Sequence, residues 1–386
     1  MSKRWCVNAL AWSLFASSWV NTSALAVDPK GGTTDINAFD FDFFGQLQLD
    51  TGKVSMAGTQ MLSVGDVVHS LKLGLGTKLS DRLSAQVEVN VSADGDVSLD
   101  DSYLRYAVSD NTSLTIGHYK VHHSLSAATS ELDGGLPERS MVSNAFEVGT
   151  GGQLGMFLHS HGDRWSLQTG VSLDDLNDGT AATNGWGLHG RVIYTPILSD
   201  GAFLHFGLSA YYRDEDDDLL SLSAQPEAWL DGDDVFTNGH VVANHYRHAN
   251  AELATSRGAW LVQAEYGGLR PRGQQSSAYD GGYIAASYVL TGEHRSYDAV
   301  SGALASLRPF LPVTKGGAGA WEIAARYSRL DLRDDEFGNS GHSWSASLNW
   351  YLSETMRLML SVTDFSANGD SRQNGQTIGI RTQLSW

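Results

Sequence analysis

The dominant pattern along the chain is an alternation of apolar and polar residues with a period of two. In the stretch FDFDFFGQLQLD (39–50), phenylalanines and leucines share one face, while aspartates and glutamines share the other. The pattern returns in RLSAQVEVNV (82–91), AWLVQAEYGG (259–268) and SWSASLNWYL (343–352). Because side chains alternate between the two faces of an extended chain, this period is typical of β-strands rather than helices.

About sixteen such runs of roughly ten residues follow one another, and ten residues is the length a tilted strand needs to cross a bilayer. Short polar turns join several of them, at 79–81, 109–111, 256–258 and 353–355, whereas longer polar loops are expected at 51–66, 121–150 and 214–238. Short turns and long loops on opposite rims are typical of outer-membrane barrels. The runs lie near 39–50, 67–78, 82–91, 98–107, 112–120, 151–159, 164–173, 185–195, 201–213, 239–252, 258–269, 280–291, 320–331, 342–352, 356–366 and 375–386.

A soluble β-sandwich would also alternate, but three features favour a membrane barrel. The runs exceed the usual five or six residues of a strand. Their apolar faces often begin or end in Trp or Tyr, and their polar faces carry charges that a dry core would not hold. We therefore predict an all-β fold, a transmembrane antiparallel β-barrel of about 16 strands with inserted loops. The last strand would close it, because every strand edge in lipid must be paired.

The amino terminus has the features of an export signal. Lys3 and Arg4 precede an apolar stretch, and the small residues Ala24 and Ala26 follow it, which is the order of a secretory signal peptide. A membrane anchor is the alternative, but Ser17, Ser18 and Asn21 break the apolar run. We predict a signal peptide at 1–26 and the barrel at 27–386. The single cysteine, Cys6, lies within this signal, so no cysteine metal ligand or disulfide is expected in the barrel.

The charge balance is acidic. The chain has 26 Lys and Arg against 44 Asp and Glu, for a formal net charge of −18. Nucleic acid is therefore not an expected partner, because its phosphates require clustered cations.

Several segments resemble the phosphate- and polyphosphate-selective porins of the Gram-negative outer membrane. They are DDSYLRYAVSDNTSLTIGHYKVHHSLSAATSELDGGLPERSMVSNAF (100–146), GGYIAASYVLTGEHRSYD (281–298), GAWEIAARYSRLDL (319–332) and LNWYLSETMRLML (348–360). The opening FDFFGQLQLD is similar to that family's first strand, although Gln46 stands where an arginine is common.

This resemblance implies a homotrimeric outer-membrane channel through which small hydrophilic solutes diffuse passively, with phosphate and other anions as the family's permeants. Lipopolysaccharide and outer-membrane lipid are then expected neighbours. The resemblance also implies that the terminal aromatic residue, here Trp386, is read by the barrel-assembly machinery. Members usually end in phenylalanine, so Trp386 keeps the ring but departs from the usual residue.

The resemblance also places two residues at the constriction. Lys120, in GHYK (117–120), matches a lysine of the family's pore, and Arg139, in LPERS (136–140), matches a Glu-Arg pair at the end of a folded loop. For Arg139, an ion pair that holds this loop is the favoured interpretation. Independently, strand parity turns a mixed set of charges into the lumen: Lys72, Arg191, Arg213, Arg326 and Arg381, with Asp40, Asp42, Asp50, Glu88, Glu265 and Glu322.

The segment RDEDDDLLSLSAQPEAWLDGDD (213–234) holds one arginine and nine carboxylates, where relatives place an arginine-rich loop. It either folds into the pore or stands in solvent, and it could bind divalent cations, although runs of acids are usually solvated. Dedicated phosphate capture needs converging cationic donors. A broad or cation-leaning porin on the same scaffold therefore stands as the alternative function.

Two further hypotheses have little support in the sequence. The histidine pairs 122–123, 159/161 and 245/248 lack carboxylates or cysteines at a supporting spacing, so we predict no metal site and no cofactor. A barrel enzyme is the remaining alternative. Ser124 beside His123 is its most obvious nucleophile and base, but no nucleophile-elbow motif occurs, and we expect no enzymatic activity.

Overall fold

A computed structural model describes residues 40–56, 62–92, 95–147, 152–177, 185–215, 219–227, 234–239, 241–273, 277–334, 337–369 and 373–386. The expected signal peptide (1–26) lies outside the described residues. In the described part of the chain, no helix is long and apolar enough to cross a membrane.

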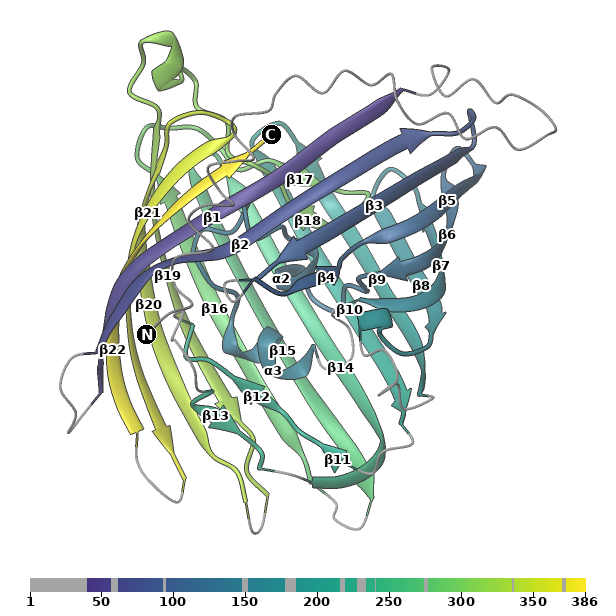
Figure 1. Cartoon of the computed structure of the whole chain (residues 1–386). Helices are drawn as coiled ribbons and strands as arrows, with labels where there is room; N and C mark the ends of the chain where they lie inside the picture. The colour runs from purple at the N-terminus through teal and green to yellow at the C-terminus, as the bar shows by residue number, and fades with distance from the viewer. Residues whose placement is uncertain are drawn as a thin grey trace.

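Sixteen antiparallel strands form a closed barrel, as the alternation predicts (Figure 1). Each strand pairs with the next along the chain, and β1 pairs with β22 to close the ring. The barrel strands are β1 (Phe41–Met56), β2 (Leu62–Lys78), β3 (Leu83–Val91), β5 (Ser102–Ser109), β6 (Thr112–Tyr119), β7 (Gln153–His161), β8 (Trp165–Ser172), β9 (Trp186–Ser199), β10 (Ala202–Asp214), β14 (Val241–Arg257), β15 (Trp260–Gly273), β16 (Tyr279–Val289), β19 (Ala320–Asp331), β20 (Ser340–Tyr351), β21 (Met356–Asn368) and β22 (Gln373–Ser385).

The two faces of the barrel wall follow the sequence alternation. Large apolar side chains point outward and stay exposed, among them Phe43 at 77%, Leu208 at 61% and Trp260 at 58%. Polar side chains at the intervening positions are buried inside, for example Asn250 and Glu252 in β14. An apolar exterior around a polar interior is the arrangement that a bilayer requires of a barrel.

One predicted loop is wrong, because most of its residues belong to strands. The segment 51–66 was predicted to be a long loop, but β1 runs to Met56 and β2 starts at Leu62, with Gly52 opposite Val64. This hairpin contains polar residues such as Thr51 and Lys53, so the apolar alternation weakens although the backbone stays paired. Strands that extend beyond the bilayer lose the sequence signal because lipid no longer selects one face.

The two rims of the barrel differ in the length of their connections. One rim has the short turns at 79–82, 110–111, 162–164, 200–201, 258–259 and 352–355, together with the end of β22. Such short turns are typical of the periplasmic side. This rim also has one long connection, 290–319, which holds the hairpin of β17 (Tyr297–Asp298) and β18 (Ala303–Leu304) and the 3-10 turn η3 (Val313–Lys315).

The described residues of three connections fill part of the barrel (Figure 1). The first, 120–152, holds the short helices α2 (Leu125–Ala128) and α3 (Met141–Phe146), capped by the side chains of Ser124 and Ser140. The second, 215–240, holds β11 (Leu219–Leu220), β12 (Ser223–Ala224) and β13 (Phe236–Thr237), and the third is 290–319. The short strand β4 (Val97–Leu99) pairs with β3.

The apolar core of the molecule lies inside the barrel, between these connections and the wall. Met141 and Phe146 of α3 pack in one cluster with Leu222 and Phe236 of the second connection. Wall residues such as Tyr279 complete the cluster. The loops are therefore held by burial of apolar surface as well as by charge.

Candidate functional site

Charged side chains inside the barrel form two groups, and the first group locks the loops to the wall. Arg191 of β9 donates two hydrogen bonds to the Glu252 carboxylate of β14, at 2.9 and 2.7 Å, and these side chains are 1% and 0% exposed. Arg191 also donates to the carbonyls of Ser301 and Gly302. A buried bidentate pair of this kind positions the connection 290–319 against β9.

The same connection is fixed a second time by Arg295. Its Nη2 lies 2.7 Å from both oxygens of Glu322 in β19, and the Tyr351 hydroxyl donates to the same carboxylate at 2.7 Å. Burial alone would lower the pKa of Arg295, but the adjacent Glu322 carboxylate raises it, so this guanidinium stays charged. Glu322, predicted to line the pore, is 0% exposed and serves as this anchor.

The second connection is anchored through Glu227. Its carboxylate accepts a hydrogen bond from Arg326 Nε of β19 at 2.8 Å and one from the Met141 backbone N–H at 3.1 Å. The backbone of Glu227 has φ of 60°, in the left-handed region that side chains other than glycine rarely adopt. An acid from the acidic loop therefore folds into the barrel. Its partner Arg326 forms an ion pair with this loop instead of facing solvent.

Helix α2 is anchored by a carboxylate at its N-terminus. Glu265 of β15 accepts hydrogen bonds from the backbone N–H groups of Leu125 and Ser126, at 3.0 and 2.9 Å. Asn250 and the Tyr283 hydroxyl also donate to it. This inward acid thus holds the first connection in place.

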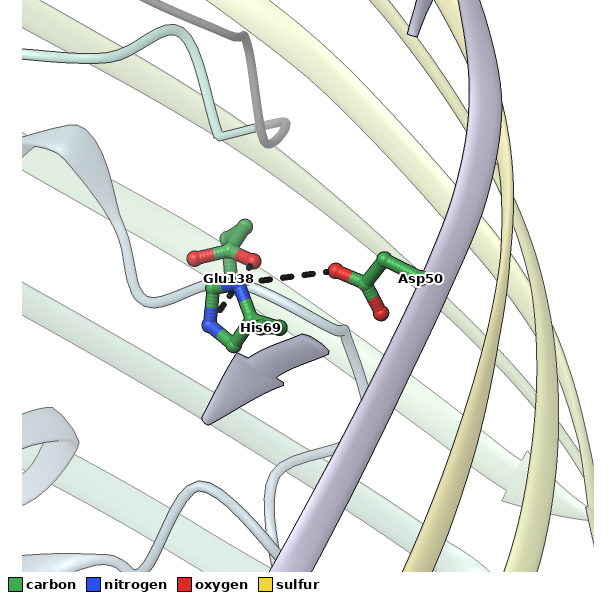
Figure 2. Close-up of side chains that lie close together, drawn as sticks. All are labelled: Asp50, His69 and Glu138. Atoms are coloured by element: carbon green, nitrogen blue, oxygen red, sulfur yellow. Dashed lines mark ion pairs between the residues drawn. The ribbon is translucent and has the colours of Figure 1, made fainter. Parts of the chain in front are cut away.

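Arg381 of β22 forms the fifth anchor, next to the one group of described residues with metal-ligand geometry (Figure 2). Asp50, His69 and Glu138 offer ligand atoms within 4.8 Å of one another. Arg381 donates to Asp50 at 2.7 and 2.6 Å and to Glu138 at 2.5 Å. Because the Arg381 guanidinium already donates hydrogen bonds to both carboxylates, the arrangement fits an ion-pair network that ties the first connection to β1 and β22 better than a cation site.

The second group of charges keeps contact with water. Lys72 of β2 lies 2.6 Å from Asp100 and 4.0 Å from Glu88, and the three side chains are 25%, 16% and 15% exposed. In the first connection, Arg139 lies 3.9 Å from Glu131 and 3.6 Å from Glu147, with exposures of 16%, 31% and 14%. The pairs of Arg191, Arg295 and Arg326 are only 0–6% exposed, whereas Asp50 and Glu138 beside Arg381 are intermediate at 11% and 18%.

Glu131 lies at the centre of this accessible group. Burial would raise its pKa, but Arg139, Lys72 and Lys120 lower it to about 2. Lys120 follows β6, and its backbone N–H donates to Asp101 at 2.8 Å. Burial, followed by the nearby Arg139, lowers the pKa of Lys120. Its ammonium has no carboxylate within 4.0 Å among the residues described.

We define the constriction cluster, named for the role that the sequence predicts for Lys120 and Arg139, as these three cations and the five carboxylates around them. The cluster has more negative than positive groups, and its partners come from both the wall and the first connection. Its members are Lys72, Lys120, Arg139, Glu88, Asp100, Asp101, Glu131 and Glu147.

The residues that the sequence predicts to line the pore fall into the same two groups, the accessible charges and the buried anchors. Lys72, Glu88, Lys120 and Arg139 belong to the constriction cluster. Arg191, Arg326, Arg381 and Glu322 face inward but lie buried in anchors. Asp40 and Asp42 are exposed at the short-turn rim, where Asp42 lies opposite Gly76, so a role for them in lining the pore stays a prediction. Parity fixes the face of a residue and not its depth in the barrel.

Several charged residues of the barrel interior were not predicted from the sequence. Glu252 and Arg105 follow the same parity as the predicted residues and could have been found by extending it. Arg105 contacts Thr115 at 3.1 Å and lies 4.6 Å from the Tyr103 ring centroid. Arg295 and Glu131 lie on connections, where no periodicity reports which way a side chain points.

The residues on which the metal and enzyme hypotheses rest make structural contacts. His159 and His161 share a face, as predicted, with ring centroids 5.8 Å apart, but His159 Nε2 contacts Ser166 and the Val300 carbonyl. Ser124 caps α2 through a hydrogen bond from the Ala127 N–H. His123 contacts His189, ring nitrogen to ring nitrogen, at 3.0 Å. These contacts are those of packed side chains.

Comparison with known proteins gives a consistent result. The family model described as "Phosphate-selective porin O and P" matches residues 45–386. The chain is 26% identical to an uncharacterized protein of Caulobacter vibrioides, covering 89% of this chain and 73% of that protein. It is 24% identical to Porin O of Pseudomonas aeruginosa, covering 96% and 95%. The fold resembles the trimer form of OmpT, an outer membrane protein of Vibrio cholerae, with a TM-score of 0.54, 12% identity and coverage of 90% and 99%.

Proposed function

Because the chain belongs to the phosphate-selective porin O and P family, whose members are outer-membrane channels for small solutes, we propose that this barrel is a weakly selective member of it. Small hydrophilic solutes, anions included, would cross it by passive diffusion. The observation that carries the proposal is the composition of the constriction cluster, where carboxylates contact or surround each accessible cation.

A phosphate dianion at the constriction cluster would meet carboxylates as well as cations. A dianion leaving water needs several oriented cationic donors at once, and each nearby carboxylate subtracts from their field. Lys72 already contacts Asp100, and Arg139 is shared by Glu131 and Glu147. Arg191, Arg295, Arg326 and Arg381 are committed to anchors. The cluster therefore favours neither sign strongly.

Selective passage of phosphate, the property named in the family's description, is the second candidate. One observation favours it: the Lys120 ammonium has no carboxylate within 4.0 Å in the described part of the chain, and Arg105 likewise has none. A phosphate could bind to either cation if the acids of the cluster were screened by salt.

The family and the fold are those of a channel rather than an enzyme. For assembly, we infer a homotrimer, supported by the trimer form in which the OmpT relative was solved. Recognition of Trp386 by the barrel-assembly machinery, and removal of residues 1–26 during export, are part of the same proposal. Lipopolysaccharide and outer-membrane lipid would surround the barrel.

Liposome swelling tests the proposed channel directly. Vesicles containing the purified protein should swell in isotonic solutions of small neutral sugars, zwitterionic amino acids and phosphate at rates that fall with solute size. Swelling with phosphate alone would instead support the selective candidate. No swelling with any solute would overturn the channel.

A further inference from the structure

Three buried histidines lie where the first connection meets the barrel wall. The exposed fractions of His123, His189 and His248 are 1%, 5% and 6%. Nε2 of His123 lies 3.0 Å from Nδ1 of His189 in β9, and the two rings stack with centroids 4.9 Å apart. The ring of Tyr211 in β10 packs against His123 and against His248 of β14, at centroid distances of 4.6 and 4.8 Å. These rings join the start of the first connection to three wall strands.

The three histidines have no acidic partner. Four other histidines each lie within 4.0 Å of a carboxylate oxygen: His69, His118, His205 and His294. Within the described ranges of the chain, no carboxylate oxygen lies that close to a ring nitrogen of His123, His189 or His248. Nδ1 of His123 and Nδ1 of His248 are buried without a hydrogen-bond partner among the same residues. A nearby carboxylate favours an imidazolium, so its absence, together with burial, favours neutral rings.

The contact between His123 and His189 depends on neutral rings. A neutral imidazole has one N–H and one bare nitrogen, so one ring donates and the other accepts. A first added proton leaves the contact intact if it goes to an outer nitrogen, such as His189 Nε2, which lies 2.6 Å from Ser172 Oγ. A second proton makes both rings imidazoliums, in which every nitrogen carries hydrogen. Two N–H groups and two like charges would then face each other across 3.0 Å, and the contact is lost.

The groups around this pair do not supply a counter-charge for the second proton. The acids among them are already engaged. Glu147 lies 3.6 Å from Arg139. Glu252 accepts two hydrogen bonds from Arg191. Glu265 accepts hydrogen bonds from the backbone of α2. The titratable and charged groups that surround the pair are Lys120, His122 and Glu147 of the first connection, Arg105 of β5, His159 of β7, Arg191 of β9, Tyr211 and Arg213 of β10, His248 and Glu252 of β14, and Glu265 of β15.

Proton uptake therefore opposes the closed contact. Burial lowers the pKa of His123 well below its ordinary value of 6.5, and the neighbouring histidines lower it further. Exposed to the water of the lumen, the ring would regain its ordinary pKa, so the open form binds more protons than the closed form. The contact is stable above pH 6.5, and the ratio of open to closed forms rises as pH falls, up to tenfold per pH unit for each histidine that takes up a proton. Shifts caused by burial reach about 3 to 5 units, so the closed form persists down to about pH 4.

We propose that His123 and His189 form an acid-sensitive latch. The latch holds the start of the first connection, residues 120–124, against β9, and it opens below about pH 4 when both rings take up protons. Opening carries Lys120 away from Asp101, which accepts its backbone N–H at 2.8 Å in the closed form. It also exposes the imidazoliums to the lumen, so the channel gains positive charge in acid.

The other contacts of the connections do not depend on neutral histidines. Arg381 holds Glu138 to the wall, and Glu227 binds the first turn of α3. In the third connection's anchor, His205 lies 3.1 Å from Glu252 and has a counter-charge when it takes up a proton. Opening is therefore confined to the start of the first connection. The latch goes beyond the proposed channel and does not depend on its ion selectivity at neutral pH.

Electron paramagnetic resonance of a spin label beside the latch tests its opening. Cys6→Ser removes the only cysteine of the sequence, and His122→Cys then gives one labelling site next to His123. In the folded barrel in detergent, the label should be restricted at pH 7 and mobile at pH 3. Because each opening takes up two protons, the mobile fraction should rise from one tenth to nine tenths within about one pH unit. A transition that spans about two units would indicate a single proton and contradict the paired latch.

Glutamine variants of the labelled protein separate the latch from other effects of acid. In His189→Gln, an amide remains beside His123 but takes up no proton, so the label should stay restricted at pH 3. His123→Gln should give the same result, which keeps the test valid if one variant fails to fold. His294→Gln is the matched control, because His294 lies 2.9 Å from Asp200 and outside the array. Its transition should equal that of the labelled parent.

Several results would overturn the latch. They are a label that stays restricted in the parent at pH 3, equal transitions in the parent and both glutamine variants, and a label that is mobile at pH 7 in both variants, since ring stacking alone would then hold the segment. Loss of the β-strand circular dichroism signal over the same pH range would show that the whole barrel unfolds, which also contradicts a local latch.

Bilayer recordings measure the effect of the latch on the lumen. At pH 3, two added positive charges should make the permeability ratio of potassium to chloride about fivefold lower in the wild type than in His189→Gln, and the two proteins should agree at pH 7. Carboxylates that titrate in acid affect both proteins alike, so the difference isolates the latch. Equal ratios at pH 3 would contradict the gain of positive charge in the lumen. The spin label reports the latch even if the proposed channel does not conduct.

Discussion

The backbones of Gly45 and Trp386 are paired by two hydrogen bonds, from Gly45 N to Trp386 O at 3.1 Å and from Trp386 N to Gly45 O at 3.2 Å. The last residue of the chain is therefore held by the first strand, and the pair completes the ladder in which β1 meets β22. In lipid, an unpaired edge at this seam would leave backbone groups without partners.

The seam leads to a prediction about Gly45. A Cβ at this position would meet Trp386 Cζ2 at 2.5 Å and the Lys72 carbonyl oxygen at 2.7 Å, whereas a Cβ at Gly190 would meet nothing within 4 Å. Gly45→Ala should therefore lower the temperature at which the folded barrel loses its anomalous gel mobility, and Gly190→Ala should not. Equal effects of both changes would show that the ring of Trp386 does not constrain the seam.

The anchor between Arg191 and Glu252 should be a major contributor to stability. Glu252→Gln leaves the Arg191 guanidinium buried without a counter-charge, which should cost about 3 kcal/mol. Denaturant unfolding in detergent micelles, followed by tryptophan fluorescence, measures this loss. Arg257→Gln, at an exposed position, should change stability by less than about 0.5 kcal/mol. A Glu252→Gln protein as stable as this control would contradict the anchor.

Lys120 should tune the charge of the constriction. Reversing one charge about 8 Å from the ion path in a water-like dielectric shifts the barriers for potassium and chloride by about 1 kcal/mol each, in opposite directions. Salt screening over about 8 Å reduces this difference to about 1 kcal/mol, so Lys120→Glu should raise the permeability ratio of potassium to chloride about fivefold. Reversal potentials in asymmetric KCl report this ratio. Lys78→Glu, at an exposed position at the end of β2 on the short-turn rim, should leave it nearly unchanged. A similar shift from both variants would place Lys120 away from the path.

Glu131 provides a prediction on pH. The cations Arg139, Lys72 and Lys120 outweigh burial and lower its pKa to about 2, from an ordinary value of 4.5. A carboxyl with a lowered pKa stabilises the folded state above its ordinary value, and this contribution disappears as pH falls through about 2. Glu131 therefore stays ionised at pH 4.

The change in permeability ratio caused by Glu131→Gln should consequently be the same at pH 7 and at pH 4. Bilayer recordings of the wild type and the variant at both pH values provide the comparison. If the difference between the two proteins disappears at pH 4, Glu131 titrates in the ordinary range, and its cationic neighbours do not hold it ionised.

Much of the wall could be predicted from the sequence. Lipid selects apolar residues on one face, so alternation locates the strands and identifies inward residues such as Arg191 and Glu322. The hairpin of β1 and β2 was missed where it contains polar residues, because that selection weakens there.

The interior was harder to predict. Parity turned Asp42 and Glu322 to the same face, yet one lies at an open rim and the other in a buried anchor. The difference depends on where the connections 120–152 and 290–319 fold, and Arg295 and Glu131 lie on such irregular segments. Glu227 shows this most clearly: an acid in an apparently solvated acidic run is buried against Arg326.

The measurement that tests the account most directly is chloride current through single channels in a bilayer while phosphate is titrated. The mixed charges of the constriction cluster predict a small reversal potential in asymmetric KCl, with phosphate current rising in proportion to concentration. Phosphate at millimolar or lower concentration that blocks chloride current, with a saturable phosphate conductance, would contradict the weakly selective channel and assign phosphate capture to Lys120 and its cationic neighbours.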